Sequence, residues 1–378
     1  MQSNEKNRKR MNVLIVSMYP LDRNTSVANS SISIIKGLLE LKHRVTVLMP
    51  AWPTNDTGVD LSSIRVIRVP GQLDQPYHLK SKWIGKLHSH LDVLDTSRGY
   101  LKSIKELVVP DEHFDIVLSL SDPYVSHLYT AKLIQLKKIR YTRWIQHWGD
   151  PMTGDYTRHF WWPVWAIRLY ERSIIRRADK AVFVTPFTYE MECGDHPRIS
   201  HKIAFAPLPA EMLPIVESSE SEDLRLSYLG DYNPAIRNLR PLYDACANRE
   251  GIRLVMAGFG PKYPDCNNVT ILPRIPQQQA QQIENESDVI VCVCNLTGVM
   301  IPGKITYKAS TNKHILVALE DDNYEAMKTY FESYNRYILC QNTVESITEA
   351  LKGLKTKRAS YKTPERLLPI NIAKEIIK

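Results

Sequence analysis

The feature that most constrains the fold is an alternation, repeated along most of the chain, between short apolar runs and helix-like segments. The apolar runs are rich in β-branched residues, as in Asn-Val-Leu-Ile-Val-Ser at residues 12–17. Continuous apolar strands separated by helices are typical of a parallel sheet with helices on both faces. In the first half we expect a helix over residues 31–41, and strands at 12–17, 44–49, 64–69, 115–121, 141–146, 180–185 and 203–206.

The alternation stops near residue 207 and begins again near residue 225. Pro207, Pro209 and Pro214 lead into a serine-rich acidic stretch at residues 217–223, a composition that suits a linker. Beyond it we expect a helix over 239–247, and strands at 225–229, 252–257, 269–272, 288–294 and 314–319. The 378 residues exceed the roughly 250–300 that one core holds, so the sequence predicts two α/β domains with a ligand cleft between them.

Composition argues against several classes of protein. The net charge of +8 is spread along the chain without a single basic stripe, which disfavours nucleic-acid binding. The six cysteines form no C-x-x-C pair, so we expect neither a metal site nor a disulfide framework, and a reducing cytoplasm fits. No run reaches the ~18 apolar residues of a membrane span. Residues 1–10 are polar and basic, which predicts a disordered tail and no signal peptide.

The sharpest local motif is Pro302-Gly303-Lys304, which follows the strand expected at residues 288–294. Proline is favoured in the first turn of a helix, so we expect a helix to begin near Pro302. The free N–H groups of such an end attract phosphate, and Lys304 adds a full positive charge. The alternative is an ordinary helix start with a surface lysine.

Two further turns follow strands in the second half. Gly230 ends one strand, and a helix start carrying Arg237 comes after it; a guanidinium suits phosphate oxygens. Gly258 and Gly260 follow the next strand, where glycine lets the backbone approach a ligand. A surface arginine and a plain tight turn are the alternatives. Asp231 is given no catalytic role.

Taken together, these motifs resemble the donor domain of GT-B glycosyltransferases, particularly family 4. The resemblance covers residues 225–319, where residues 302–316 are similar to the family's block "P-G-K-hydrophobic-x-E-Y … K-P-hydrophobic". The first half agrees more weakly, at residues 12–20, 44–50, 148–152 and 171–185. The resemblance implies a GT-B fold of the α/β class, in which two Rossmann-like doubly wound domains face a central cleft.

The resemblance also implies domain boundaries. Residues 11–210 would form the N-terminal acceptor-binding domain, completed by a C-terminal helix within residues 362–378. Residues 211–224 would be the linker, and residues 225–361 the domain that binds the nucleotide-sugar donor.

The implied activity is transfer of a sugar from a nucleotide-diphosphate donor to a glycan or lipid-linked acceptor. It would be retaining, would need no metal or other cofactor, and would serve bacterial cell-surface polysaccharide synthesis, in the cytoplasm or at the inner face of its membrane. Arg237 and Lys304 would neutralise the departing diphosphate. The expected donor-binding residues are Gly230, Arg237, Gly258, Gly260, Ile275, Pro302, Gly303, Lys304 and Tyr307.

The sequence departs from the family at two glutamates. Tyr307 stands where the family has the glutamate that usually binds the donor ribose, and Val299 replaces the glutamate eight residues earlier. The first loop, residues 24–30, keeps small residues but lacks the family's glycines. These departures leave open an altered donor, a catalytically silent nucleotide-sugar-binding protein, or a sugar-nucleotide epimerase of the same fold.

On the acceptor side, His147 and Asp150 follow the strand expected at residues 141–146. Both would act as catalytic groups, with His147 orienting or deprotonating the acceptor hydroxyl. The alternative is that His147 only packs between the neighbouring tryptophans. His127 is a weaker candidate for the same role.

Residues 158–180 combine aromatic and basic side chains on one expected helix. Such a helix suits an anionic membrane interface, which would bring a lipid-linked acceptor within reach. The alternative is a core-packing helix with an arginine-rich outer face.

Overall fold

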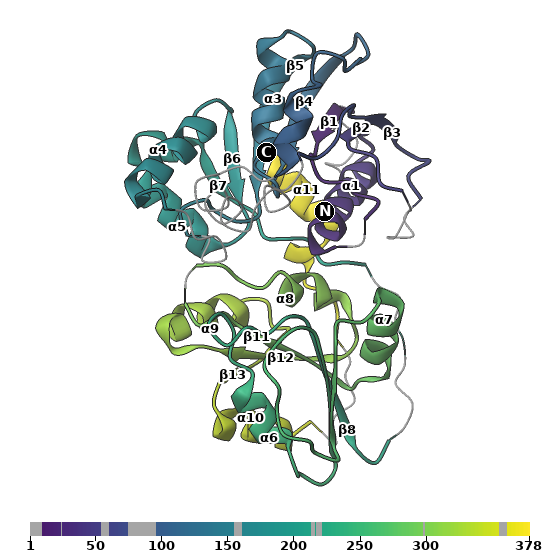
Figure 1. The fold of residues 1–378 in the computed structure, drawn as a ribbon, viewed down its shortest axis with the longest axis vertical. Helices are drawn as coiled ribbons and strands as arrows, with labels where there is room; N and C mark the ends of the chain where they lie inside the picture. The colour runs from purple at the N-terminus through teal and green to yellow at the C-terminus, as the bar shows by residue number, and fades with distance from the viewer. Residues whose placement is uncertain are drawn as a thin grey trace, which may run out of the picture. The chain divides into compact units, whose positions relative to one another are not determined.

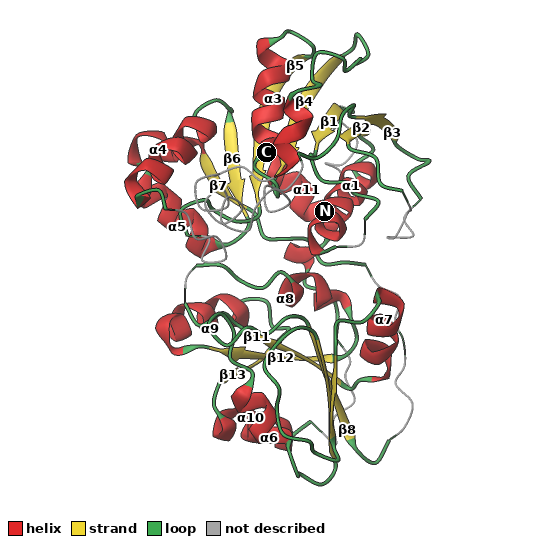
Figure 2. Cartoon of the chain, in the orientation of Figure 1, coloured by secondary structure: helices red, strands yellow, loops and turns green. Residues whose placement is uncertain are grey.

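The computed structural model describes residues 10–23, 25–53, 60–74, 96–154, 161–212, 216, 221–297, 299–354 and 361–378. The chain divides into two compact units, each of which is described by itself (Figures 1 and 2). Unit 1 comprises Met1–Pro209 and Pro369–Lys378, and unit 2 comprises Ala210–Leu368.

Unit 1 is built on a seven-stranded parallel sheet of order β3-β2-β1-β4-β5-β6-β7. The strands are β1 (Asn12–Val16), β2 (Arg44–Met49), β3 (Arg65–Arg68), β4 (His113–Leu120), β5 (Arg140–Trp148), β6 (Lys180–Phe183) and β7 (Ile203–Phe205). Its helices are α1 (Ser26–Glu40), α3 (Val125–Gln135), α4 (Val164–Ile175), α5 (Pro186–Asp195) and α11 (Pro369–Ile377), with short 3-10 turns η2 (Thr96–Leu101) and η3 (Pro197–Lys202).

Helices cover both faces of this sheet, which explains why its central strands are apolar throughout. In β1, Val13 and Ile15 pack with residues of α1 and α11, whereas Leu14 and Val16 pack on the opposite face with residues of α3. Side chains alternate between the two faces of a strand, so a strand covered on both faces has no polar side.

The C-terminal helix α11 belongs to unit 1, where it lies against α1. A glycine makes this contact close: a Cβ built on Gly37 would lie 2.1 Å from the main-chain oxygen of Pro369. The contact joins the two ends of the chain within one core.

Unit 2 contains a six-stranded parallel sheet of order β10-β9-β8-β11-β12-β13. The strands are β8 (Leu224–Leu229), β9 (Ile252–Ala257), β10 (Val269–Leu272), β11 (Val289–Val293), β12 (His314–Leu319) and β13 (Ile338–Gln341). Its helices are α6 (Arg240–Cys246), α7 (Gln277–Glu286), α8 (Lys304–Tyr307), α9 (Tyr324–Glu332) and α10 (Val344–Lys352), with 3-10 turns η4 (Lys308–Ser310), η5 (Asp321–Asn323) and η6 (Glu365–Leu367).

Several elements differ from expectation, among them α1, β5 and β13. Helix α1 begins five residues earlier than predicted, because Thr25 caps it by accepting a hydrogen bond from the Ala28 N–H at 3.3 Å. Strand β5 continues through Trp148 instead of ending at Gln146, because its last residues still pair with β6. Strand β13 was not predicted, since its short sequence Ile-Leu-Cys-Gln carries little periodic signal. All six cysteines are free.

Candidate active site

The candidate donor site lies on unit 2, at the carboxyl ends of its central strands. Turns after β8, β9 and β10 carry Gly230, Gly258 and Ile275, and the segment after β11 carries Lys304. Because neighbouring strands are parallel, all of these turns emerge at the same edge of the sheet, which is where open α/β sheets bind ligands.

Asp231 ties three of these turns together. One carboxylate oxygen accepts a hydrogen bond from the Phe259 N–H at 3.0 Å, and the other pairs with the Arg274 guanidinium. The Arg274 guanidinium also lies over the Phe259 ring, 5.3 Å from its centre. Asp231 therefore organises the edge, a role that sequence reasoning missed because an aspartate in a turn gives no signal of its partners.

The two later glycines are required by packing between turns. A Cβ on Gly258, whose φ is +147°, would lie 2.3 Å from the main-chain oxygen of Gly230, and a Cβ on Gly260 would lie 2.0 Å from the Tyr232 ring. The turn after β9, which carries both glycines, therefore stacks closely against the turn after β8. This physical reason differs from the expected one, close approach to a ligand.

Arg237 is held in place by three neutral acceptors. One terminal nitrogen donates to the Tyr228 hydroxyl at 3.3 Å and to the main-chain oxygen of Asp231 at 3.4 Å, and the other donates to Asn295 Oδ1 at 2.8 Å. Asn295 in turn donates to the Met300 carbonyl at 2.9 Å. These contacts orient the guanidinium at the edge of the sheet.

Asn295 and Tyr228 are the supporting residues that sequence reasoning overlooked. Both are almost fully buried, at 5% and 4% exposed. A signal existed for Asn295, a polar residue directly after an apolar strand that ends at the ligand-binding edge.

Lys304 also lies beside this turn. Its ammonium lies 3.1 Å from the position where Gly230 would carry a Cβ, and the Tyr228 hydroxyl lies 3.9 Å from that position. Burial is the main cause that lowers the pKa of Lys304, while the nearby Glu284 carboxylate opposes the shift and Arg237 adds to it. In the described part of the chain, the ammonium makes no hydrogen bond or ion pair.

The structure therefore brings Arg237 and Lys304 together around the turn at Gly230, although 66 residues separate them in sequence. Two cations that repel one another form a site that favours a multiply charged anion. Gly230 contributes by having no side chain in the space beside the ammonium.

The helix expected to begin near Pro302 begins at Lys304 and is short. Helix α8 has only four residues and continues as the 3-10 turn η4. Its first turn is closed by hydrogen bonds to the carbonyl groups of Pro302 and Gly303. A single helical turn has only a small dipole. The attraction for phosphate that was expected from both the helix end and Lys304 therefore comes mainly from the charge of Lys304.

The remaining predicted donor residues lie at different depths. Ile275 is half-buried in the segment between β10 and α7. Tyr307 is buried, at 7% exposed, and its main-chain carbonyl accepts a hydrogen bond from the Glu211 N–H at 2.9 Å. Val299 is half-buried and offers no polar group. No carboxylate thus stands at either of the two departure positions.

In unit 1, His147 lies within β5, which corrects the expectation that it follows the strand. It pairs with Leu120 of β4 and Val182 of β6, and its side chain is 3% exposed. Burial lowers the pKa of His147 to about 4. It does not pack between Trp144 and Trp148 as the alternative expected. These residues are three and one positions away in the strand, and strand residues an odd number of positions apart point to opposite faces of the sheet.

His127 is buried on α3. Its Nδ1 lies 2.8 Å from the Ser119 hydroxyl, and its ring centre lies 4.5 Å from that of Trp148. Burial, and secondarily the nearby His147, lower the pKa of His127 to about 3. Asp150 lies beyond the end of β5 and is half-buried, so it is the acceptor-side candidate nearest to solvent.

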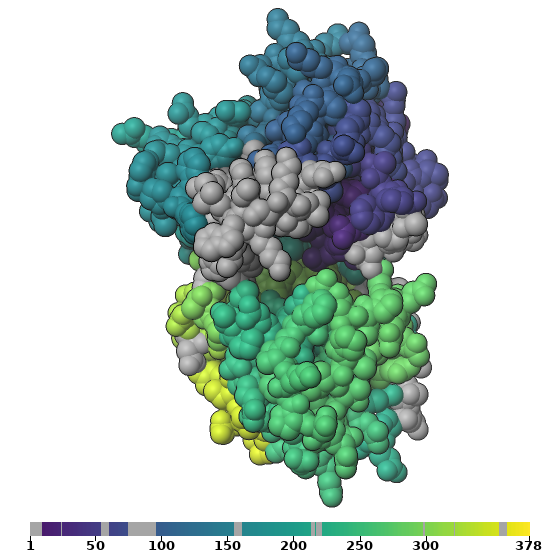
Figure 3. All heavy atoms as spheres, in the orientation of Figure 1, coloured from purple at the N-terminus to yellow at the C-terminus, as the bar shows by residue number. Residues whose placement is uncertain are grey.

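Helix α4 places a largely apolar patch on the surface of unit 1. Its inner face packs through Ile167, Ile174 and Ile175. The exposed side of its first turns, with the residues just before it, carries what we name the tryptophan patch: Trp161 (62% exposed), Trp162 (44%), Val164 (55%), Trp165 (65%) and Leu169 (55%). Figure 1 labels α4 at the left of unit 1, and atoms of the same teal colour lie there in the space-filling view (Figure 3).

Comparison with solved structures identifies the architecture. An α-glucosyltransferase in complex with UDP and a 13-mer DNA aligns over 97% of this chain and 96% of its own, with a TM-score of 0.57 at 14% identity. HepE of Anabaena, in complex with UDP and glucose, aligns over 97% and 96%, with a TM-score of 0.56 at 11% identity. A candidate UDP-N-acetylglucosamine 2-epimerase of Listeria monocytogenes aligns over 96% and 94%, with a TM-score of 0.52 at 11% identity.

No protein-family model matches the sequence, and no curated protein matches it significantly. The structural likeness, at 11–14% sequence identity, therefore establishes the fold. With two parallel α/β sheets and near-complete alignment to such structures, the chain has the two-domain, Rossmann-like GT-B fold that its sequence predicted.

Proposed function

We propose that the chain is a glycosyltransferase that moves a sugar from a nucleotide-diphosphate donor to an acceptor. The observation that carries this proposal is the convergence of Arg237 and Lys304 beside the turn at Gly230. The relatives of this fold that were solved with UDP, or with UDP and glucose, support a donor of the same class.

In the proposed reaction, the bond between the sugar's anomeric carbon and the phosphate oxygen breaks, and the diphosphate leaves with the electron pair. The acceptor oxygen forms the new bond, and its proton passes to the departing diphosphate. Negative charge grows on the diphosphate as the bond lengthens, so fixed positive charge there lowers the barrier. Arg237 and Lys304 supply that charge without a metal ion, and retention of the anomeric configuration is part of the proposal.

Acceptor chemistry is assigned to unit 1, with Asp150 contacting the acceptor hydroxyl. His147 keeps its predicted place on the acceptor side. Its burial and lowered pKa mean that the ring is neutral near pH 7, so it can accept a proton only after solvent or substrate reaches it.

The donor-binding part is tested by measuring the affinity of the full chain for a panel of nucleoside diphosphates and nucleotide sugars with a chelator present. We expect one nucleotide class to bind, and Lys304→Met to weaken that binding while Arg253→Met does not. Arg253 is a matched control because it pairs with Asp223 at the opposite end of the same sheet. Absence of binding by every nucleotide would overturn the proposal.

A same-fold epimerase is the second candidate, favoured by the likeness to the Listeria structure. The two activities differ in their need for an acceptor. An epimerase converts the donor to its isomer in the absence of acceptor, whereas a transferase releases nucleoside diphosphate when an acceptor is added. Product analysis of one reaction with and without acceptor separates them, and a silent binding protein yields neither product.

We further propose that the tryptophan patch contacts an anionic membrane and so brings a lipid-linked acceptor of cell-surface polysaccharide synthesis to unit 1. Aromatic side chains favour the lipid–water interface, and Arg176, which directly follows α4, is exposed where it can meet anionic headgroups. No helix within the described residues is long and apolar enough to cross a membrane.

Liposome flotation tests the membrane proposal. We expect co-flotation with anionic vesicles, and loss of it in Trp161→Ser/Trp165→Ser. Val108→Ser is the control, because Val108 is an exposed apolar residue of unit 1 outside the patch, at 83% exposed. Co-flotation with neutral vesicles only, or with none, would remove the claim.

A further inference from the structure

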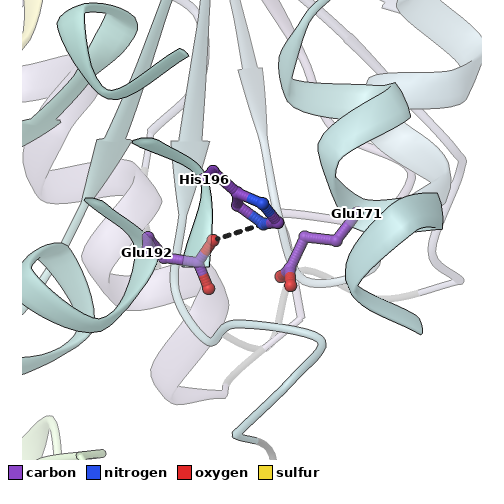
Figure 4. A group of neighbouring side chains, drawn as sticks. All are labelled: Glu171, Glu192 and His196. Carbon is purple, nitrogen blue, oxygen red and sulfur yellow. Dashed lines mark ion pairs between the residues drawn. The ribbon is translucent and has the colours of Figure 1, made fainter. Parts of the chain in front are cut away.

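Unit 1 holds a cluster of three buried ionisable residues that the proposed transfer reaction does not use. Glu171 comes from α4, Glu192 from α5, and His196 from the position that ends α5. Their side chains are 0%, 0% and 2% exposed. Figure 4 shows the two carboxylates and the imidazole pointing toward one another.

The hydrogen bonds of this cluster are incomplete. Glu171 accepts from the Met152 N–H at 2.5 Å and from the Thr153 hydroxyl at 2.8 Å. By contrast, neither oxygen of Glu192 accepts a hydrogen bond among the residues described, and its nearest partner is His196 Nε2 at 3.4 Å. That ring nitrogen makes no hydrogen bond there either.

Buried carboxylates without a cation are costly, because burial removes the hydration of the charge. Burial raises the pKa of Glu171 and of Glu192 to about 8. Arg168 pairs instead with Asp195 at 2.8 Å, and within the described ranges Arg172 forms no ion pair with either glutamate. Among the residues that the structure describes, the cluster thus lacks a positive charge at its centre.

We propose that Glu171, Glu192 and His196 bind one divalent cation. Their ligand atoms all lie within 4.8 Å of one another. One imidazole nitrogen and two carboxylates form a donor set that suits Zn²⁺ or Mn²⁺, and two negative charges balance the ion. Ligands at about 2.0–2.2 Å from a metal lie roughly 3.5 Å apart, so small side-chain rotations complete the site.

The state of His196 is compatible with a ligand. Burial lowers its pKa, which keeps the ring neutral and its nitrogen lone pair available. Glu192 and His196 lie four residues apart at the end of one helix, so both face the same side. Glu171 completes the set from a second helix, which makes the ion a bridge between α4 and α5.

The site would position a loop and would not take part in sugar transfer. Glu171 holds the main chain at Met152, two residues beyond Asp150. An ion on Glu171 would therefore fix the loop that carries the acceptor-side candidate. This inference does not depend on the proposed function, because it concerns a different unit from the two-cation site.

The experiment measures metal content and stability of the full chain. The protein is dialysed against chelator, freed of it, and titrated with Zn²⁺ or Mn²⁺, with bound metal counted by mass spectrometry and unfolding followed by heating. We expect one bound ion per chain and a rise in Tm. Glu192→Gln should weaken binding at least tenfold and remove that rise.

Glu190→Gln is the matched control, because Glu190 is exposed on the same helix. If Glu192→Gln fails to fold, His196→Gln replaces it. The absorption spectrum of bound Co²⁺ reports the imidazole ligand directly. The proposal is overturned if no stoichiometric metal binds, or if metal binding is equal in Glu192→Gln and Glu190→Gln. It is also overturned by a more stable, metal-free Glu192→Gln, which would identify a proton shared among the three residues.

Discussion

The two sheets differ in the environment of the polar side chains near the carboxyl ends of their strands. In unit 2, Arg237 donates hydrogen bonds to Tyr228 and Asn295 at the edge of the sheet, and the Lys304 ammonium lies beside Gly230. In unit 1, His127 and His147 are buried, and burial drives them toward the neutral form. One architecture thus offers a charged anion site in one half and a neutral, buried polar core in the other.

The physical reason lies in the residues at the end of each strand. After β8 and β9 come glycine turns that leave room beside the sheet edge, and the Lys304 ammonium occupies part of that room. Strand β5, by contrast, ends in aromatic residues, and Trp148 is enclosed by Phe183 and His127. Small turn residues leave functional groups accessible, whereas large side chains cover them.

The largest effect that tests this contrast is the loss of charge in unit 2. We expect Arg237→Gln or Lys304→Met to lower the rate of sugar transfer by roughly 10²–10³-fold, because each removes charge stabilisation of the leaving diphosphate. Steady-state kinetics with the identified donor measures it. A loss below tenfold, or an equal loss in Arg253→Met, would mean that the two cations do not contact the reacting phosphates.

A second test concerns the close turns. Gly258→Ala should lower the free energy of unfolding by about 1–3 kcal/mol, because its Cβ would meet the Gly230 backbone and the φ of +147° disfavours a side chain. Urea unfolding measures it. Gly353→Ala is the control, since nothing lies within 4 Å of a Cβ there. Equal stability of the two variants would contradict the packing account.

The buried histidines of unit 1 should make the free energy of unfolding fall at acidic pH. In the unfolded chain His147 has the ordinary histidine pKa of about 6.5, whereas burial lowers its pKa in the folded chain to about 4. The contribution of His147 to stability is therefore complete above pH 6.5 and is lost as pH falls toward 4. The loss is of order 1–2 kcal/mol per histidine at pH 5. Denaturant midpoints at pH 5 and pH 7 measure it.

His147→Gln should reduce this loss between the two pH values, and His201→Gln, at an exposed position, should leave it unchanged. An identical pH dependence in both variants would show that His147 is not the group responsible. Burial also lowers the pKa of His127, so it contributes in the same direction.

The smallest effect is the pH dependence of donor binding. Burial is the main cause that lowers the pKa of Lys304. The Glu284 carboxylate raises this pKa, and the positive charges of Lys308 and Arg237 lower it further. The ammonium therefore deprotonates at lower pH than an exposed lysine. Binding of nucleoside diphosphate should weaken as pH rises through that pKa, by up to about tenfold per unit. In Lys304→Arg this upper limb should move beyond the accessible range. Calorimetric titrations between pH 7 and 10 test it.

The sequence by itself determined most of the fold. Strands such as residues 12–17 and 314–319 are buried on both faces. Their almost entirely apolar composition predicts this burial. It also indicated Arg237, Lys304 and the glycine turns, because turn residues and charges beside strand ends are local signals. Boundaries were less certain where capping or edge pairing decides them, as at Thr25 and in β13.

Only the tertiary structure decided which polar residues meet. Asn295 and Tyr228 fix Arg237, Asp231 joins three turns, and Glu171 reaches a helix end 21 residues further along. Such partnerships depend on distances across the sheet and between helices, which residue types and spacing do not encode. For the same reason burial of His147 could not be read from its position after an apolar run, because burial depends on the side chains that pack over it.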